Sequence, residues 1–337
     1  AITQMKGKRN TILVTGGAGY VGSALVPALL DAGFCVKVLD LFLYGRNVFG
    51  RRNRDANLEL TRGDIRDKEI IANALSGVDC VIHLASVSND PSFELDPKLG
   101  KSVNYDATVQ LIDLSKIAGV SRFILASTSS VYGVKKEKKV TEDLPLEPLT
   151  DYSKYKAFSE AYLLTHAGDM VAVVLRPATV CGYAPRMRLD LTVNLLTVGA
   201  LVKKHMTILG GSQYRPNIHI QDMVRAYKKM IKYPKDKISG NIYNVGYENY
   251  SILDIAHMIK KVLKDSSITI EMKPTNDLRS YRIDSGKIKK ELGFAPVHSV
   301  EEAIMDIARA YHSGRIASPL DDILYTNIKT MQAARLQ

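Results

Sequence analysis

The sequence predicts an α/β fold in which a doubly wound parallel sheet carries helices on both faces. Short apolar, β-branched runs alternate along the first half of the chain with stretches whose apolar residues recur at helical spacing. The runs are almost continuously apolar, as in strands that are buried on both faces of a parallel sheet. The first run also breaks into a turn with three spaced glycines, and a helical pattern begins directly after it.

The first strand is expected at 11–15, and the turn after it contains Gly16, Gly19 and Gly22. The first glycine lets the chain turn, the second lets backbone approach a pyrophosphate, and the third lets the next helix pack closely on the strand. The N–H groups and positive dipole end of that helix favour an anion. Pro27 falls inside the helical pattern and predicts a kink or a shorter helix. The turn is therefore a candidate dinucleotide site, formed by Gly16, Gly19, Tyr20, Val21 and Gly22.

A carboxylate follows the second apolar run, at 35–39. Asp40 lies 18 residues past the last glycine, close to the spacing of about 20 expected for a carboxylate that binds an adenosine ribose. It would accept hydrogen bonds from the 2′- and 3′-hydroxyls and repel a 2′-phosphate, so the sequence favours NAD over NADP. Arg46 keeps NADP open as an alternative, because a nearby arginine can receive that phosphate.

The remaining strands of this part of the chain are expected at 58–60, 78–85 and 122–126, and helices are expected at 102–118 and 151–166. The third strand leads to Asp64 and Ile65, which are expected beside an adenine ring, and the fourth ends in Leu84 and Ala85. His83 is interpreted as a packed histidine at the strand end rather than as a base. Ligands of such sheets bind outside the carboxyl ends of the strands, so we expect the chemistry there.

Two stretches beyond the fifth strand carry candidate catalytic groups. A hydroxyl-rich stretch at 127–133 follows the strand directly, and a later helix opens with Tyr152 and Lys156. These two residues are four positions apart, so they share one face of the helix. A lysine ammonium beside a phenol favours the phenolate and would lower its pKa from about 10 toward the working pH. A tyrosinate can then remove a hydroxyl proton while a hydride leaves the same carbon for a nicotinamide.

With these motifs in place, the chain resembles the extended short-chain dehydrogenases/reductases, and among them the sugar-nucleotide epimerase and dehydratase family. The resemblance covers about residues 10–310. Besides the motifs above, it rests on Asn104, on Thr128 with 131–133, on 175–182, on 215–222 and on 292–296. It implies a Rossmann-type sheet, NAD as the cofactor, a nucleotide-diphosphate sugar as the substrate and a smaller α/β domain that binds it.

The resemblance also implies roles for single residues. Tyr152 would be the general base, Lys156 would lower its pKa and bind the nicotinamide ribose, and Thr128 would hydrogen-bond the reacting oxygen. The planar guanidinium of arginine suits a phosphate, because it can donate two parallel hydrogen bonds. The residues that match positions holding a nucleotide-sugar diphosphate are Asn194, Arg215 and Arg279.

The residues after Thr128 bear on the reaction. Relatives that dehydrate a hexose at C4 and C6 carry an acidic pair there, since removing a C5 proton and expelling a C6 hydroxyl needs an extra acid and base. Sugar-acid decarboxylases usually carry glutamate at the second position. This chain has Ser129 and Ser130 instead, which resembles the 4-epimerases. Thr179, however, stands where many 4-epimerases have asparagine.

The segment after the fourth strand leaves a second reaction open. Ser88, Asn89 and Asp90 precede Pro91 and either form a turn, which we favour, or face the sugar. If they face the sugar, a net 4-dehydrogenase or ketoreductase becomes the alternative to 4-epimerisation, with 4,6-dehydration behind both. A non-catalytic dinucleotide-binding regulator would be expected to lack the tyrosine or the lysine, and both are present.

The expected organisation is a NAD-binding domain at 1–182 with a returning segment at 213–249, and a substrate domain formed by 183–212 and 250–337. The resemblance implies a homodimer in which the helices at 102–118 and 151–166 form a four-helix bundle.

Composition excludes several other classes of function. The 337 residues carry a formal net charge of +11, but the basic residues are spread in small groups without interleaved aromatic residues, so no nucleic-acid partner is expected. No run of about eighteen apolar residues predicts a membrane span. The three cysteines lie far apart, which fits a reducing compartment and no metal site. Lys6, Lys8 and Arg9 precede the glycine turn without a secretory segment, so we expect a short leader on a cytoplasmic enzyme.

Overall fold

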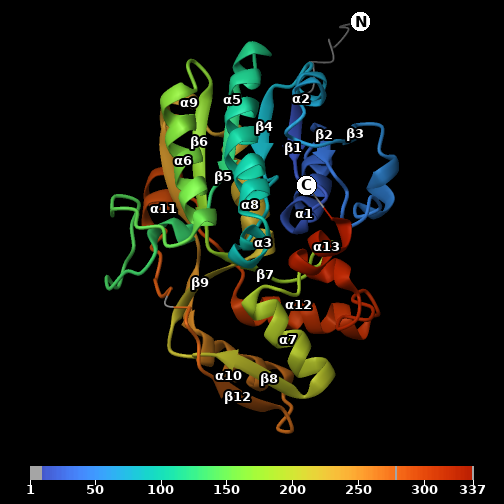
Figure 1. Cartoon of the computed structure of the whole chain (residues 1–337), viewed down its shortest axis with the longest axis vertical. Helices are drawn as coiled ribbons and strands as arrows, with labels where there is room; N and C mark the ends of the chain where they lie inside the picture. Colours follow the sequence, from blue (N-terminus) through green and yellow to red (C-terminus); the bar gives the residue numbers. More distant parts are fainter. Residues whose placement is uncertain (1–9, 278, 336–337) are drawn as a thin grey trace, which may run out of the picture.

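A seven-stranded parallel sheet forms the centre of the computed structural model, which describes residues 10–277 and 279–335 (Figure 1). The basic residues expected to form a leader lie outside this range. The strand order β10-β6-β5-β4-β1-β2-β3 reverses between β1 and β4, so the sheet is doubly wound as predicted. Its strands are β1 (Thr11–Thr15), β2 (Cys35–Asp40), β3 (Leu58–Arg62), β4 (Cys80–His83), β5 (Arg122–Ala126), β6 (Val171–Pro177) and β10 (Asn241–Val245).

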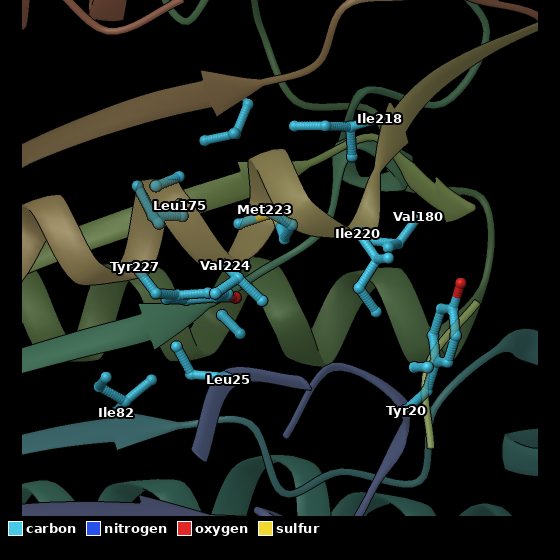
Figure 2. Close-up of a cluster of buried hydrophobic side chains, with 14 of the residues drawn as sticks. Tyr20, Leu25, Ile82, Leu175, Val180, Ile218, Ile220, Met223, Val224 and Tyr227 are labelled. Carbon is cyan, nitrogen blue, oxygen red and sulfur yellow. The ribbon is translucent and has the colours of Figure 1, made fainter. Parts of the chain in front are cut away.

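Alternate residues of the strands enter two apolar cores, one on each face of the sheet. Ile12 and Val14 join the core beneath α1 (Tyr20–Asp31) and α8 (Ile220–Lys232). Leu13, which lies between them, joins the opposite core. Figure 2 shows the first core, with side chains of α8 facing those of the sheet and of α1. The helices of the second core are α2 (Lys68–Ala74), α5 (Ala107–Ile117) and α6 (Asp151–His166).

Two local expectations differ from the structure. The helix expected at 102–118 begins with a π-helical turn, η2 (Ser102–Asp106), before α5. Of the two outcomes predicted for Pro27, the shorter helix is not found, because α1 continues to Asp31. Two short helices that the sequence analysis did not separate follow β4, namely α3 (Asp90–Leu95) and α4 (Pro97–Lys101).

A smaller group of elements follows β6 and packs around a separate apolar cluster. In Figure 1 this group lies below the seven-stranded sheet. Its strands form a three-stranded sheet of β7 (Thr179–Cys181), β9 (Tyr214–His219) and β11 (Glu248–Ser251), and a parallel pair of β8 (His205–Leu209) and β12 (Thr269–Lys273). Its main helices are α7 (Thr192–Lys203), α10 (Ile252–Leu263) and α12 (Val300–His312).

The remaining short elements connect these parts: η1 (Gly50–Arg54), η3 (Ser129–Tyr132), α9 (Lys235–Ile238), α11 (Gly286–Leu292), η4 (Ile323–Tyr325) and α13 (Asn327–Ala334). Over residues 10–277 and 279–335, no helix has both the length and the apolar character that crossing a membrane requires.

A buried ion pair ties the strands to the helix that carries the predicted tyrosine. Arg176 of β6 and Glu160 of α6 approach to 2.6 Å, and both side chains are 3% exposed. The same guanidinium donates to the hydroxyl of Tyr132 at 2.9 Å, and that hydroxyl donates to Asn244 of β10 at 2.7 Å. Ser127 also donates to Glu160. Removing one partner of such a pair leaves a buried charge uncompensated, so this network fixes α6 relative to the ends of β5 and β6.

Candidate active site

A cavity of about 520 Å³ opens at the carboxyl ends of the parallel strands, where the sequence predicts the chemistry. Residues that follow six of the seven strands line it, because neighbouring parallel strands end at the same edge of the sheet. These residues are Gly16, Leu41, Gly63, Leu84, Ser127 and Ala178.

Three glycines bring the N-terminus of α1 to this cavity. Gly16 has a φ of +68°, and a Cβ there would lie 2.6 Å from the backbone nitrogen of Ala85. A Cβ at Gly22 would lie 2.3 Å from the carbonyl oxygen of Gly17, so α1 sits closer to the turn than a side chain permits. Gly19 is the N-cap residue, and among the described residues no side chain caps α1. The first N–H groups of α1 are therefore free to bind an anion.

Two carboxylates that the sequence assigned to the cofactor also reach the cavity. Asp40 accepts backbone N–H groups of Ala18 at 2.9 Å and Phe42 at 2.7 Å. Burial raises the pKa of Asp40, and these two hydrogen bonds oppose the rise. Asp64 is ion-paired with Arg66 at 2.7 Å. The predicted cofactor residues that line the cavity are Gly16, Gly19, Tyr20, Val21, Gly22, Asp40, Asp64, Ile65, Leu84, Ala85 and Lys156.

Two other residues that the sequence analysis considered, Arg46 and His83, are not among the described residues that line the cavity. The Arg46 guanidinium lies 5.5 Å from the ring centroid of Phe42. His83 is buried, with Nδ1 2.6 Å from the Thr15 hydroxyl and Nε2 2.8 Å from the Thr108 hydroxyl. Burial lowers the pKa of His83 to about 3, so it is neutral and packed, as the sequence analysis interpreted it.

The three predicted catalytic side chains line one part of the cavity wall. Lys156 donates from Nζ to the carbonyl oxygen of Ala126 at 3.0 Å, and Nζ lies 6.0 Å from the ring centroid of Tyr152. Thr128 is the N-cap residue of η3, and its hydroxyl accepts the backbone N–H of Ser130 at 3.1 Å. All three residues thus line the same cavity.

The expected lowering of the Tyr152 pKa is not found. Burial raises the pKa of Tyr152, and the Asp90 carboxylate adds to the rise, whereas Arg188 and a hydrogen bond with the Asn89 backbone oppose it. Burial also lowers the pKa of Lys156 to about 8, and the charge of Glu160 opposes that change. Desolvation is the largest effect on both groups, and the charge that opposes it at Tyr152 is that of Arg188.

The two predicted substrate arginines share one carboxylate. Arg215 and Arg279 both pair with Asp277, at 2.9 Å and 2.7 Å. Arg279 also forms an ion pair with Asp90, at the start of α3. The predicted substrate residues that line the cavity are Ser88, Asn89, Thr179, Arg215 and Arg279.

The segment after β4 forms a turn and also faces the cavity. Asn89 has a φ of +82° and caps α3 by accepting the N–H of Ser92 at 3.0 Å, which is the turn that the sequence favoured. Asn89 and Asp90 nevertheless line the cavity. Asn104 of η2 holds the segment by two hydrogen bonds to the backbone of Val87, at 2.7 Å and 2.9 Å.

Asn194, the remaining residue predicted to hold the substrate, is not among the described residues that line the cavity. It is fully buried, accepts the N–H of Gly182 at 3.0 Å, and donates to the Tyr20 hydroxyl and the Arg188 carbonyl. These partners occupy its amide, so the structure gives it a bracing role.

Several cavity residues were missed by the sequence analysis. Arg186 and Arg188 belong to the segment 183–212, which it assigned to the substrate domain without naming them. Asn327 and Met331 lie on α13, beyond the stretch that carried the resemblance, and no local signal marks them. Other missed residues of the wall are Tyr44, Asp190, Tyr227 and Tyr281.

Comparison with known proteins gives one consistent family. A sequence profile of the NAD dependent epimerase/dehydratase family matches residues 12–246. The chain is 31% identical over 312 residues to UDP-glucuronic acid decarboxylase 1 of Arabidopsis thaliana, spanning 88% of this chain and 68% of that protein. It is 27% identical over 324 residues to UDP-glucose 4-epimerase of Lactobacillus helveticus, spanning 89% and 96% of the two chains. The structure of dTDP-glucose 4,6-dehydratase from Streptomyces venezuelae with NAD bound superimposes with a TM-score of 0.83 at 25% identity, covering 92% of this chain and 100% of that one.

The burial of Lys156 predicts a pH-dependent stability. The unfolded chain keeps this lysine protonated to a pH of about 10.4, whereas the folded protein releases the proton near pH 8. Between these values the unfolded state binds more protons, so the free energy of unfolding rises with pH. Between pH 7.5 and 9.5, the free energy of unfolding should rise by on the order of 1–2 kcal/mol less in Lys156→Met than in the wild type.

Denaturant titrations at both pH values measure this difference. Lys154→Met, which removes a half-exposed lysine of the same helix, is the matched control and should keep the wild-type rise. An unchanged rise in Lys156→Met would show that this lysine titrates as it does in water.

Proposed function

The chain belongs to the NAD dependent epimerase/dehydratase family, and from this premise we propose that it epimerises a nucleotide-linked sugar through transient oxidation at C4. The residues around the cavity fit NAD. A Cβ at Gly16 or Gly22 would collide with backbone, the N-terminus of α1 favours an anion, and the Asp40 carboxylate suits ribose hydroxyls. When bound, NAD supplies an acceptor for a hydride from a hydroxyl-bearing carbon.

Tyr152 is proposed to move the hydroxyl proton. Its phenol must first lose its own proton, and we propose that the Lys156 ammonium, 6.0 Å from the ring centroid, stabilises the phenolate together with Arg188. Thr128, whose hydroxyl faces the same wall, is proposed to hydrogen-bond the reacting oxygen and fix its position. Tyr152 then returns the proton to the same oxygen when the ketone is reduced from its other face.

The observation that carries this proposal is the pair of serines after Thr128. Ser130 Oγ lies 3.0 Å from Thr128 Oγ1 and 2.7 Å from Ser153 Oγ, and Ser129 donates to the Tyr281 hydroxyl at 3.4 Å. Both serines therefore bond to other hydroxyls and supply no carboxylate at these positions. Transient oxidation and return of the hydride need no acid or base there, whereas elimination of water does.

The substrate is proposed to be a nucleotide-diphosphate sugar. Arg215 and Arg279 present guanidinium groups to the cavity, and their partner Asp277 holds them together. Ser88, Asn89 and Thr179 add polar groups to the wall. We propose accordingly that 1–182 with 213–249 binds the cofactor, and that 183–212 with 250–337 covers the substrate.

A net 4-dehydrogenase or ketoreductase is the second candidate, because Asn89 and Asp90 line the cavity. Asp90 also receives a hydrogen bond from Thr150, at the N-cap of α6. A carboxylate near Tyr152 offers a further group that could exchange a proton with the substrate.

The purified protein with NAD and a panel of UDP-, GDP-, CDP- and dTDP-sugars distinguishes these reactions. We expect a new isomer of unchanged mass without net NADH. Loss of two mass units with accumulating NADH would establish a dehydrogenase, and loss of water would show that the serines do not exclude elimination.

Tyr152→Phe should lower kcat by about 10²- to 10⁴-fold, the usual contribution of a general acid–base group, while NAD still binds. Turnover with the active sugar and calorimetric NAD binding, measured on the same preparation, give both values. Tyr247→Phe, at a 49% exposed tyrosine that is not among the described residues lining the cavity, is the control. Wild-type turnover in Tyr152→Phe would contradict the assigned role.

We propose a homodimer through α5 and α6, which lie against each other (Figure 1). Phe158 is 54% exposed and Ile117 is 82% exposed, although both are large and apolar. Tyr155 extends this surface, with its ring centroid 5.9 Å from those of Tyr105 and Phe158. Exposed apolar side chains on two neighbouring helices are typical of a contact between subunits.

Phe158→Glu should convert the dimer to a monomer, because it places a charge at the centre of this apolar surface. Sedimentation equilibrium gives the mass. Val297→Glu, at a 62% exposed apolar residue elsewhere, is the control and should stay dimeric. A wild-type protein of monomeric mass would contradict the proposal.

A further inference from the structure

Two buried arginines in the loop between β7 and α7 remain without a role in the proposed reaction. Arg186 and Arg188 are 4% and 8% exposed, and both line the cavity. Arginine is rarely buried to this extent unless it is paired. Their buried guanidinium groups therefore need hydrogen-bond acceptors.

The loop that carries them is fastened to the first turns of α1. The backbone N–H of Arg186 donates to Ser23 Oγ at 3.0 Å. The side-chain amide of Asn194 donates to the Arg188 carbonyl oxygen at 2.9 Å and to the Tyr20 hydroxyl at 3.1 Å. In Figure 2 that hydroxyl points away from the apolar side chains around Tyr227. The loop is thereby fastened to α1, and both arginines line the same cavity as the first residues of that helix.

Arg186 has no carboxylate partner among the ion pairs of residues 10–277 and 279–335. Its Nη2 donates to Asn327 Oδ1 at 2.6 Å, and its guanidinium lies 3.6 Å from the ring centroid of Tyr44. Its Nε is buried without a hydrogen-bond partner. A buried N–H group without an acceptor is costly, so Nε is a donor that a ligand can satisfy.

Arg188 is only partly satisfied. Its Nε pairs with Asp190 at 2.8 Å, and its Nη1 donates to Ser88 Oγ at 3.3 Å. Its Nη2 is buried without a hydrogen-bond partner. Asp190 also accepts the N–H of Asn327, so its charge is shared with a second donor. The two arginines thus offer two donors without a hydrogen-bond partner, and the carboxylates of Asp190 and Asp40 both act on Arg186.

We propose that Arg186 and Arg188 form a cation pair that binds the diphosphate of the dinucleotide, together with the N-terminus of α1. A diphosphate has several acceptor oxygens and negative charge, which the free Nε, the free Nη2 and the first N–H groups of α1 all match. This pair is distinct from Arg215 and Arg279, which pair with Asp277. The inference rests on the use of NAD by this family, but not on the reaction.

The electrostatics of Arg186 agree with this assignment. Burial lowers the pKa of Arg186 to about 10, and the nearby charge of Arg188 acts in the same direction. A ligand with two negative charges, bound between the two arginines, would offset both the burial of Arg186 and its repulsion by Arg188.

Binding without turnover tests the proposal. Calorimetry with NAD, ADP-ribose, adenosine and UDP should be performed on the wild type, on Arg186→Gln and on Arg188→Gln. Each variant should bind NAD and ADP-ribose about 10- to 100-fold more weakly, because a charge-assisted hydrogen bond is lost. Adenosine, which has no phosphate, and UDP should bind as they do to the wild type.

Further variants separate a binding role from a structural one. Arg188→Lys keeps the charge but loses the planar fork, so its affinity for NAD should fall between those of the wild type and Arg188→Gln. Arg54→Gln, at an exposed arginine of η1, is matched in charge and should not change binding. If both glutamine variants fold too poorly to measure, the lysine variant still decides, since wild-type NAD affinity in it would contradict the proposal.

Two results would overturn the assignment. Weaker UDP binding with unchanged NAD binding would give the pair to the diphosphate of the nucleotide sugar. Unchanged binding of every ligand would leave the arginines as structural groups. Because no result depends on turnover, an error in the proposed reaction would not affect this test.

Discussion

The close packing of α1 against the turn after β1 is the constraint on which the cavity depends. A Cβ at Gly22 would lie 2.3 Å from the Gly17 carbonyl oxygen, and one at Gly16 would lie 2.6 Å from the Ala85 nitrogen. This packing places the N-terminus of α1 beside the ends of β1 and β4. The loop after β7 is then fastened to Tyr20 and Ser23 of the same helix. The anion-binding wall and the strand ends therefore share one fixed frame.

Burial dominates the electrostatics inside that frame. It raises the pKa of Tyr152 and lowers the pKa of Lys156 to about 8, so desolvation opposes the charged form of each group. It also lowers the pKa of Arg186 to about 10. Because burial disfavours the charged forms of Lys156 and Arg186, an anion bound in the cavity stabilises both cations. We infer that ligand charge and protonation at the proposed catalytic pair are linked, because Arg188 acts on the Tyr152 pKa as well.

Patterns that are local in sequence predicted the sheet, the glycine turn and the family, because strand alternation and glycine spacing are properties of short segments. Properties set by distant contacts were missed or misjudged. Asn194 was assigned to the substrate, but Gly182, Tyr20 and Arg188 occupy its amide. The Tyr152 pKa depends on burial, which four-residue spacing does not reveal. Asn327 reaches the cavity only because α13 folds back onto the segment that follows β4.

A nucleotide sugar deuterated at C4 tests the central claim most directly, since the claim is that hydride leaves C4 and returns to the same carbon. After incubation with NAD, and with the sugar that the protein turns over, mass spectrometry and NMR locate the deuterium in the product. The account predicts an isomer that keeps deuterium at C4. Deuterium at C6 of a product that has lost water, or in accumulated reduced cofactor, would contradict it and would identify a dehydratase or a dehydrogenase, respectively.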